Sequence, residues 1–132
     1  MKITIIGLGL IGGSIAIDLR KNKFATEIIG VDASEENAAQ ALKIGLVDRI
    51  ENLENGVKNT DIVVIAIPVD KEVIVLPQVL DFINQATTVT DMSSTKRVII
   101  DSVKNHPRRK NFVPAHPMSG PENSGPTAAL EN

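Results

Sequence analysis

The stretch MKITIIGLGLIGGSIAIDLR, residues 1–20, decides the fold of this chain. Residues 2–7 are a short apolar run with β-branched side chains, which is typical of a strand buried on both faces of a parallel sheet. Apolar residues then recur at helical spacing and predict a helix that ends near Asn22. Three glycines lie at the junction of the strand and the helix: Gly7, Gly9 and Gly12. A strand, a glycine-rich turn and a helix form the first half of a βαβ unit.

The rest of the chain alternates between strand-like and helix-like segments. Further strands are expected at residues 27–32, 61–68, 87–92 and 112–114, with a weaker candidate at 45–50. Helices are expected after an N-cap at Ser34 to about Lys43, from 69 to 84 with a kink or an early break at Pro77, and from about Ser94 to Lys104. The alternation predicts an α/β fold: a doubly wound Rossmann-type parallel sheet of about six strands, with helices on both faces.

The composition is that of one ordinary globular domain. The 132 residues are 42% hydrophobic and 23% charged, with a formal net charge of −2. Because Lys and Arg are not in clustered excess, nucleic acid is not expected as a partner. The chain has no cysteine and no other pattern of metal ligands, so no metal is expected. The first apolar run is too short for a signal peptide or a membrane span, and we expect a cytoplasmic protein without a membrane partner.

The glycine spacing between a strand and a helix is typical of a dinucleotide-binding turn. The first glycine would permit the tight turn, the second would let a pyrophosphate approach the backbone, and the third would let the helix pack closely on the strand. The helix N-terminus would add unpaired N–H donors for the phosphates. A glycine-rich turn with a purely steric role is the alternative. The residues expected to contact the cofactor here are Gly7, Leu8, Gly9, Leu10, Ile11 and Gly12.

Asp32 strengthens the dinucleotide interpretation. It lies 20 residues after Gly12, at the end of the second predicted strand, where a carboxylate can accept both hydroxyls of an adenosine ribose. The same carboxylate would repel a 2′-phosphate, and the surrounding VDASEEN, residues 31–37, offers no Arg or Lys to offset that repulsion. NAD is therefore expected as the cofactor rather than NADP. An alternative role for Asp32 is to cap the next helix, and the two roles are compatible.

Two further stretches carry candidate groups for a reaction. TDMSSTK, residues 90–96, closes the fifth predicted strand, and HPMSGPENSG, residues 116–125, lies in a tail rich in proline, glycine and serine. Both are expected to open onto the crevice at the carboxyl ends of the strands. The end of the strand at 61–68 should also reach the cofactor by its position, through Ala66, Ile67 and Pro68.

At these stretches the sequence resembles the prephenate and arogenate dehydrogenase family of tyrosine biosynthesis. The resemblance rests on GLGLIGGS (7–14), on DMSSTK (91–96) in the place of a D-x-x-S-x-K pattern, and on HPMSGPENSG, which is close to the family's H-P-M-x-G-x-E-x-S-G. Two residues depart from the pattern. Pro121 stands where a small polar residue is expected, and Ser93 replaces a frequent glycine, which is tolerable if its φ is negative.

The resemblance implies an NAD-dependent dehydrogenase that acts by oxidative decarboxylation. Its substrate would be prephenate, giving 4-hydroxyphenylpyruvate, or the aminated relative arogenate. The resemblance assigns His116 as the base that accepts the proton of the substrate hydroxyl, a task that suits an imidazole. Ser94 would hydrogen-bond this histidine or the hydroxyl. Lys96 is expected to shape the pocket or to be solvated, and Glu122 to tune His116 or to contact substrate.

The resemblance also implies how the chain is divided into domains. Residues 1–115 would be the dinucleotide-binding Rossmann domain. Residues 116–132 would be an active-site loop and the start of a linker to a missing helical domain, through which the full-length protein would form a homodimer. The chain is then expected to bind NAD but to turn over substrate poorly.

Other functions remain open at this point. A free-standing NAD-binding module without catalysis would keep the glycines and Asp32 but would not need His116 or Ser94. A dehydrogenase of 3-hydroxy acids or of imines would share the N-terminal pattern but not the tail motif. His106 and the basic residues 108–110 are interpreted as helix-end and solvated charges, and Asp91 as a cap for the following helix.

Overall fold

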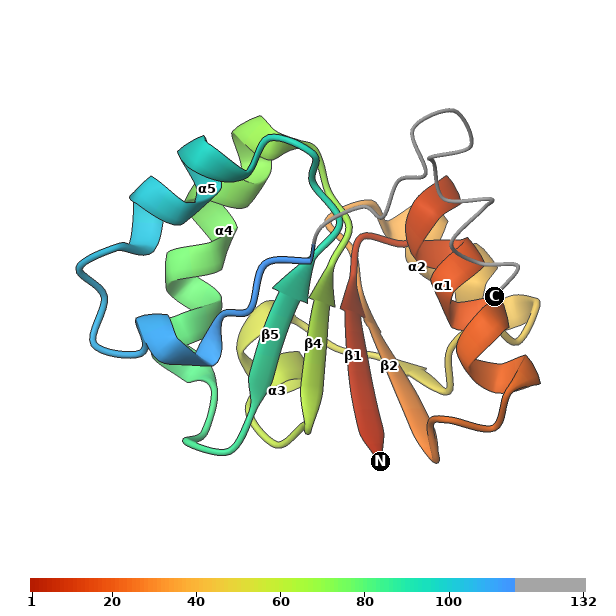
Figure 1. Cartoon of the computed structure of the whole chain (residues 1–132). Coiled ribbons are helices and arrows are strands. Elements are labelled where there is room, and N and C mark those ends of the chain that lie inside the picture. The colour runs from red at the N-terminus through yellow and green to blue at the C-terminus, as the bar shows by residue number, and fades with distance from the viewer. Residues whose placement is uncertain (116–132) are drawn as a thin grey trace.

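The structure of the protein is a computed structural model that describes residues 1–115. Strands and helices alternate along the chain (Figure 1). The strands are β1 (Lys2–Ile6), β2 (Glu27–Val31), β3 (Arg49–Ile50), β4 (Ile62–Ile65) and β5 (Thr88–Asp91). The helices are α1 (Leu10–Lys21), α2 (Glu35–Lys43), α3 (Leu53–Val57), α4 (Val69–Phe82) and α5 (Lys96–Val103), and a 3₁₀ turn follows at Arg109–Asn111.

The strands form one parallel sheet in the order β3-β2-β1-β4-β5. In the central strand β1, Ile3 is paired with Ile28 of β2 on one side and with Ile62 of β4 on the other. The chain therefore winds from β1 to β3 in one direction and then crosses back past β1 to build β4 and β5. This order confirms the doubly wound Rossmann-type fold. Its switch point lies between β1 and β4, where sheets of this kind bind their ligands.

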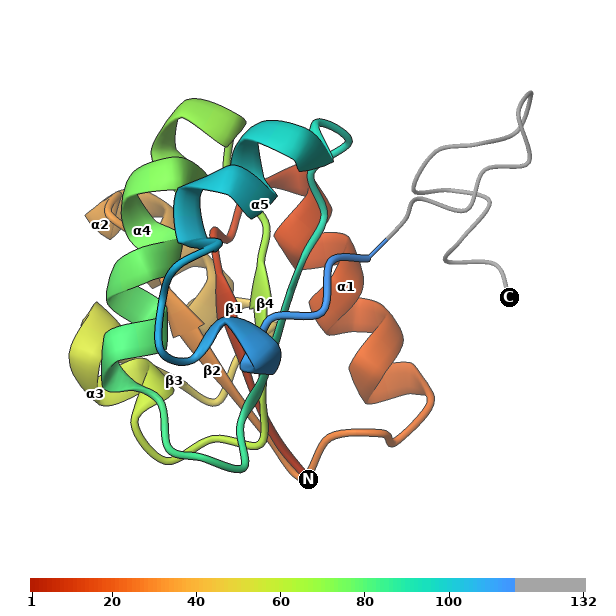
Figure 2. The same ribbon diagram turned by 60° about the vertical axis from the view of Figure 1, so that its left-hand side comes forward.

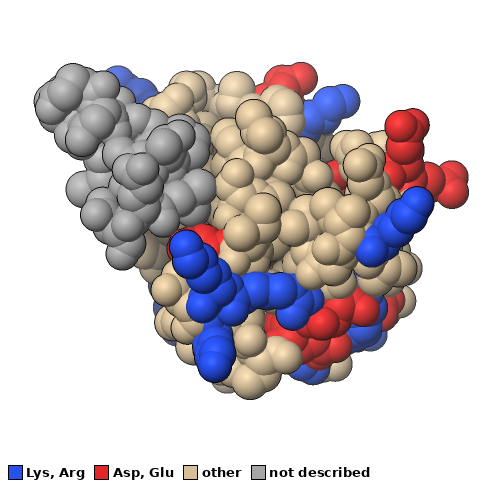
Figure 3. Space-filling model, turned by 90° about the vertical axis from the view of Figure 1, so that its right-hand side faces the viewer, with Lys and Arg blue, Asp and Glu red and all other residues tan. Residues whose placement is uncertain are grey.

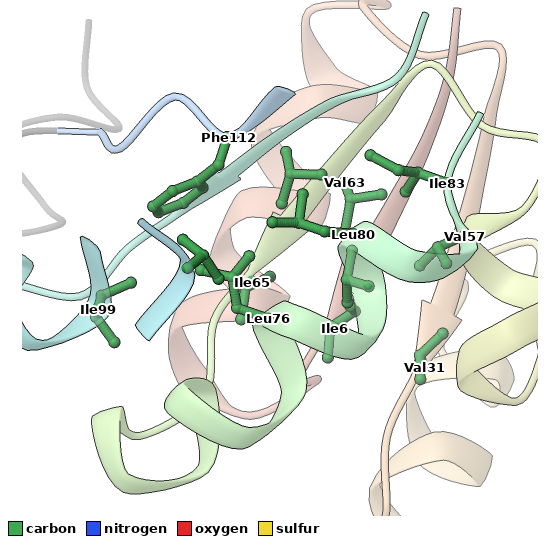
Figure 4. Packing of buried hydrophobic residues seen from close by; sticks show 13 residues of the cluster. Ile6, Val31, Val57, Val63, Ile65, Leu76, Leu80, Ile83, Ile99 and Phe112 are labelled. Atoms are coloured by element: carbon green, nitrogen blue, oxygen red, sulfur yellow. The ribbon is translucent and has the colours of Figure 1, made fainter. Parts of the chain in front are cut away.

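Helices cover both faces of the sheet, as the alternation predicted (Figures 1 and 2). Helices α1 and α2 pack on one face, where Ala16 and Ala41 belong to one buried cluster. Helices α3, α4 and α5 pack on the other face over a second buried cluster, in which Leu76 and Leu80 of α4 lie against the sheet (Figure 4). The sheet is therefore apolar on both faces, which explains why its strands show no polar alternation.

Local signals account for most helix boundaries. Ser34 caps α2 as predicted, because its Oγ accepts a hydrogen bond from the backbone N–H of Asn37 at 3.2 Å. The predicted early break at Pro77 does not occur, since α4 continues through this residue to Phe82. Leu76 precedes this proline and Val79 follows it, and both side chains are buried. Their burial offsets the loss of the backbone hydrogen bond that proline cannot donate.

The predicted sixth strand at 112–114 is wrong, and among residues 1–115 the sheet has five strands. Phe112 makes only an isolated parallel bridge with Val89 of β5, and the N–H of Val113 donates to the carbonyl of Val89 at 2.8 Å. Within the described residues no further pairing with β5 follows this bridge. The Phe112 ring is nevertheless buried in the second cluster, beneath α4 and α5 (Figure 4), so it fastens the end of the described chain to the core.

Candidate functional site

Two cavities open at the carboxyl ends of the strands and share the glycine-rich turn. The Asp32 cavity, of about 620 Å³, is lined by residues that include Gly7, Val31, Asp32, Glu51, Asn52 and Lys71. The Ser94 cavity, of about 500 Å³, is lined by residues that include Leu10, Ile11, Met92, Ser93, Ser94 and Thr95. Gly9, Ala66, Ile67 and Pro68 line both cavities. Together the cavities form one elongated site that reaches from the end of β2 to the end of β5.

The backbone of the protein itself requires two of the three glycines. Gly7 has a φ of +98°, and a Cβ at this position would overlap the carbonyl oxygen of Ala66. A Cβ on Gly12 would overlap the carbonyl oxygen of Gly7. Gly9 differs, because its φ is −79° and none of residues 1–115 beyond its own neighbours places an atom within 4 Å of where its Cβ would stand. These residues give no reason for a glycine at position 9, whereas a group bound against its backbone would.

The N-terminus of α1 is suited to an anion. Gly9 is the N-cap of this helix and supplies no side-chain acceptor, and the first turn contains no acidic residue. The N–H groups of the first turn are therefore available to a ligand, and the helix dipole adds partial positive charge at the same place. Because Leu10 and Ile11 of this turn line the Ser94 cavity, a pyrophosphate bound here would span the two cavities.

Asp32 lies half-buried in the cavity named after it and holds the turn in place. Its Oδ2 accepts a hydrogen bond from the N–H of Leu8, and its Oδ1 accepts one from the N–H of Ser34, each at 2.7 Å. The N–H of Gly7 donates to the carbonyl of Val31 at 2.8 Å, which fastens the turn to the same strand end. Each carboxylate oxygen retains a second lone pair, so both can still accept a ribose hydroxyl.

The loop of residues 92–95 brings Ser94 to the other end of the site. Ser94 is exposed and lines its cavity together with the shared wall of Ala66, Ile67 and Pro68. Ser93 fits without strain, because Lys23 is the only non-glycine residue among those described that has a positive φ. The predicted base His116, with Pro121 and Glu122, lies outside the described residues.

A buried group of charged side chains supports this loop, and the sequence did not reveal it. We call Glu72, Asp91 and Lys96 the Glu72 cluster. Lys96 is only 12% exposed, and its Nζ lies 2.7 Å from Oδ1 of Asp91, which is fully buried. The expectation of a solvated Lys96 is therefore wrong, and Asp91 forms an ion pair rather than a helix cap. Burial and, after it, the neighbouring Asp91 together raise the pKa of Glu72 to about 9 against the opposing effect of Lys96.

Sequence reasoning missed several residues of the site. Helix α3 was not predicted, although Asn52 caps it by accepting a hydrogen bond from the N–H of Asn55 at 2.8 Å, and this helix places Leu53 in the Asp32 cavity. Lys71 also lines the cavity from the first turn of α4. A signal for Glu72 was present, because it shares the helical spacing of the buried Leu76 and Val79.

The remaining candidate groups do not build a second site. The Nε2 atom of His106 lies 2.8 Å from Oδ1 of Asp81, and its Nδ1 accepts a hydrogen bond from the N–H of Arg108. On the face covered by α1 and α2, basic and acidic side chains occur close together (Figure 3), as in the ion pair of Arg20 with Asp48. Within residues 1–115, no group of three or more His, Cys, Asp or Glu side chains could hold a metal ion. None of the helices in this range is both long and apolar enough to cross a bilayer.

Sequence comparisons find relatives in the family that the sequence resembles. The chain is 43% identical over 136 residues to the prephenate dehydrogenase of Bacillus subtilis (strain 168), an alignment that covers 99% of this chain and 37% of that protein. It is 38% identical to the prephenate dehydrogenase of Lactococcus lactis subsp. cremoris (strain MG1363), with 97% of this chain and 37% of that protein covered. The chain thus spans well under half the length of these relatives.

Structural comparison gives the same result. The crystal structure of prephenate dehydrogenase from A. aeolicus in complex with hydroxyphenyl propionate and NAD+ matches with a TM-score of 0.79 and 29% identity, over 96% of this chain and 45% of that chain. Synechocystis arogenate dehydrogenase matches with a TM-score of 0.74 and 28% identity, over 96% of this chain and 44% of that chain. The profile of the family described as prephenate dehydrogenase, nucleotide-binding domain, matches residues 15–132. The chain therefore belongs to the prephenate dehydrogenase family and corresponds to its nucleotide-binding domain.

Proposed function

We propose that this chain binds NAD as the cofactor domain of an enzyme that oxidatively decarboxylates prephenate. The observation that carries the proposal is the space beside Gly9. Among the described residues, no atom beyond the neighbours of Gly9 lies within 4 Å of the place where its Cβ would stand, and none pairs with the first N–H groups of α1. This space also connects the Asp32 and Ser94 cavities. The relative from A. aeolicus, solved with NAD+ and hydroxyphenyl propionate, supports the same cofactor and an aromatic ligand.

The residues present fit the two ends of such a cofactor. The adenosine ribose would bind Asp32, the pyrophosphate would bind the turn from Gly7 to Gly12, and the nicotinamide would lie toward Ser94. When bound, the nicotinamide supplies a hydride acceptor. Among the described residues that line the Asp32 cavity, the carboxylates of Asp32 and Glu51 accompany one cation, Lys71, so the excess of negative charge disfavours a 2′-phosphate.

The substrate side of the site rests on two residues. Ser94 would hydrogen-bond the substrate hydroxyl or the catalytic histidine, and His116 would accept the proton of that hydroxyl. Residues 116–132 would form the active-site loop and lead toward a helical domain that pairs two copies of the full-length protein. Arogenate is the second candidate substrate, favoured by the match to the Synechocystis arogenate dehydrogenase.

The catalytic part of the proposal can be tested by kinetic and binding measurements on full-length protein that contains this chain. His116→Ala should lower kcat by roughly two to four orders of magnitude, while the Kd for NAD stays within about twofold of the wild-type value. Stopped-flow measurement of NADH formation with prephenate and with arogenate would identify the preferred substrate. Unchanged kcat in this variant would contradict the assignment of the base, and NAD binding without turnover of either compound would favour a non-catalytic module.

A further inference from the structure

The Glu72 cluster closes the loop of residues 92–95 at its base. Asp91 is the last residue of β5, and Lys96 is the first residue of α5. Their ion pair of 2.7 Å therefore joins the two ends of the loop that contains Ser94. Both side chains are largely removed from water, since Asp91 is 0% and Lys96 12% exposed, so the pair is protected from screening by salt. This ion pair adds to the backbone hydrogen bond that the N–H of Met92 donates to the carbonyl of Ile65 at 3.0 Å.

The side chain of Glu72 is the third member of the cluster, next to this ion pair. It lies in the first turn of α4, is fully buried, and both of its carboxyl oxygens lack a hydrogen-bond partner among the described residues. The Oδ2 atom of Asp91 is likewise without a partner there. Two adjacent buried carboxylates cannot both remain charged beside a single ammonium group. One proton between Glu72 and Asp91 gives each carboxyl group a hydrogen-bond partner and leaves the cluster with no net charge.

The cluster also connects the two walls of the Ser94 cavity. One wall is the loop of residues 92–95, and the other is the segment from Ala66 to Val69 that leads into α4. Glu72 is fixed to that segment, because its N–H donates to the carbonyl of Pro68 at 2.9 Å. Any movement of the loop relative to this wall must therefore separate Glu72 from Asp91.

We propose that a neutral Glu72 carboxyl donates a hydrogen bond to the Asp91 carboxylate, and that the Glu72 cluster thereby positions Ser94 at the nicotinamide end of the site. The three members are positioning residues, since none of them lines either cavity. The proposal rests on the proposed function, because it assigns the Ser94 cavity to the nicotinamide. It identifies a proton that stays on the protein at neutral pH and takes no part in hydride transfer.

Titration calorimetry of this chain with NAD and with ADP-ribose tests the positioning role, because ADP-ribose lacks the nicotinamide. Glu72→Met and Lys96→Met should weaken NAD binding by about tenfold and leave the Kd for ADP-ribose within about twofold. Glu72→Gln can donate the same hydrogen bond and should restore NAD binding to nearly the wild-type value. Lys104→Met, at the exposed end of the same helix, is the control for loss of a positive charge.

The outcomes separate the inference from the function on which it rests. Equal losses for NAD and ADP-ribose would mean that the cluster only stabilises the fold, and would overturn the inference alone. A wild-type chain that binds neither compound would overturn the proposed function and the inference with it. Infrared spectroscopy at pH 7.5 provides a second test that needs no destabilised variant. The carbonyl stretch of a protonated carboxyl should be present in the wild type and absent in Glu72→Gln, and its absence from the wild type would overturn the shared proton.

Discussion

At the scale of single residues, the site is defined by groups that the protein does not need for its own packing. Gly7 and Gly12 are fixed by sterics, since a side chain on either would overlap a backbone carbonyl. Gly9 has ordinary backbone angles and open space, so no contact within residues 1–115 offsets its cost in chain entropy. Binding of a ligand against the backbone is the physical explanation for its presence.

Substitution of the glycines separates these two roles. Gly9→Ala should change the free energy of unfolding by less than about 1 kcal/mol and weaken NAD binding by at least about tenfold, because the added methyl group enters the ligand space. Gly12→Ala is the matched control and should destabilise the chain by roughly 2 kcal/mol or more through overpacking. Urea unfolding and calorimetry measure both quantities. Undiminished NAD binding by Gly9→Ala would contradict the position assigned to the pyrophosphate.

Glu72 predicts an unusual dependence of stability on pH. Its pKa is raised from the ordinary 4.5 to about 9 by burial and by Asp91, so between these values the folded chain holds a proton that the unfolded chain releases. Stability should therefore fall as pH rises through this window, by up to about 1.4 kcal/mol per pH unit. Below the window, both states hold the proton and this contribution to the slope vanishes.

Glu72→Gln should remove this contribution and be more stable than the wild type at pH 8.5. Far-UV circular dichroism during urea unfolding is the suitable measurement, because the chain has no Trp or Tyr to report by fluorescence. Parallel stability curves for the two proteins between pH 5 and pH 8.5 would contradict a protonated Glu72.

At the scale of elements, the strands and the long helices were predictable because their signals are local. The buried runs of β1 and β4 and the Ser34 cap of α2 are examples. The segment at 112–114 failed because its apolar residues serve a different purpose. Phe112 inserts its ring into the second buried cluster and makes only an isolated bridge with Val89 of β5. The short helix α3 was not predicted, because the five residues that follow the Asn52 cap are too few to show a periodic pattern.

Phe112 should contribute more to stability than its place near the end of the described chain suggests. The ring is 2% exposed and closes the apolar cluster over β5 (Figure 4). Phe112→Ala should lower the free energy of unfolding by about 3–5 kcal/mol, whereas Val113→Ala, at an exposed neighbour, should cost less than about 1 kcal/mol. Urea unfolding of the two variants checks the contrast, and similar losses for both would mean that the ring is not anchored in the core.

At the scale of the whole molecule, the order of the strands places the groups of the site together. The glycine turn, Asp32 and Ser94 follow β1, β2 and β5, and in a parallel sheet those ends meet on one edge. This convergence was predictable from alternating strands and helices. The Glu72 cluster was not, because Glu72 is distant in sequence from Asp91 and Lys96, and only the docking of α4 and α5 on the sheet buries the three groups together.

Calorimetric titration of this chain with NAD and with NADP tests the central claim most directly. The Asp32 carboxylate would lie a few ångströms from a 2′-phosphate, where repulsion at an effective dielectric constant near 20 reaches about 4 kcal/mol before screening by salt. We expect saturable one-to-one binding of NAD, with an affinity at least about tenfold higher than that for NADP. Absence of heat with NAD, or tighter binding of NADP, would contradict it.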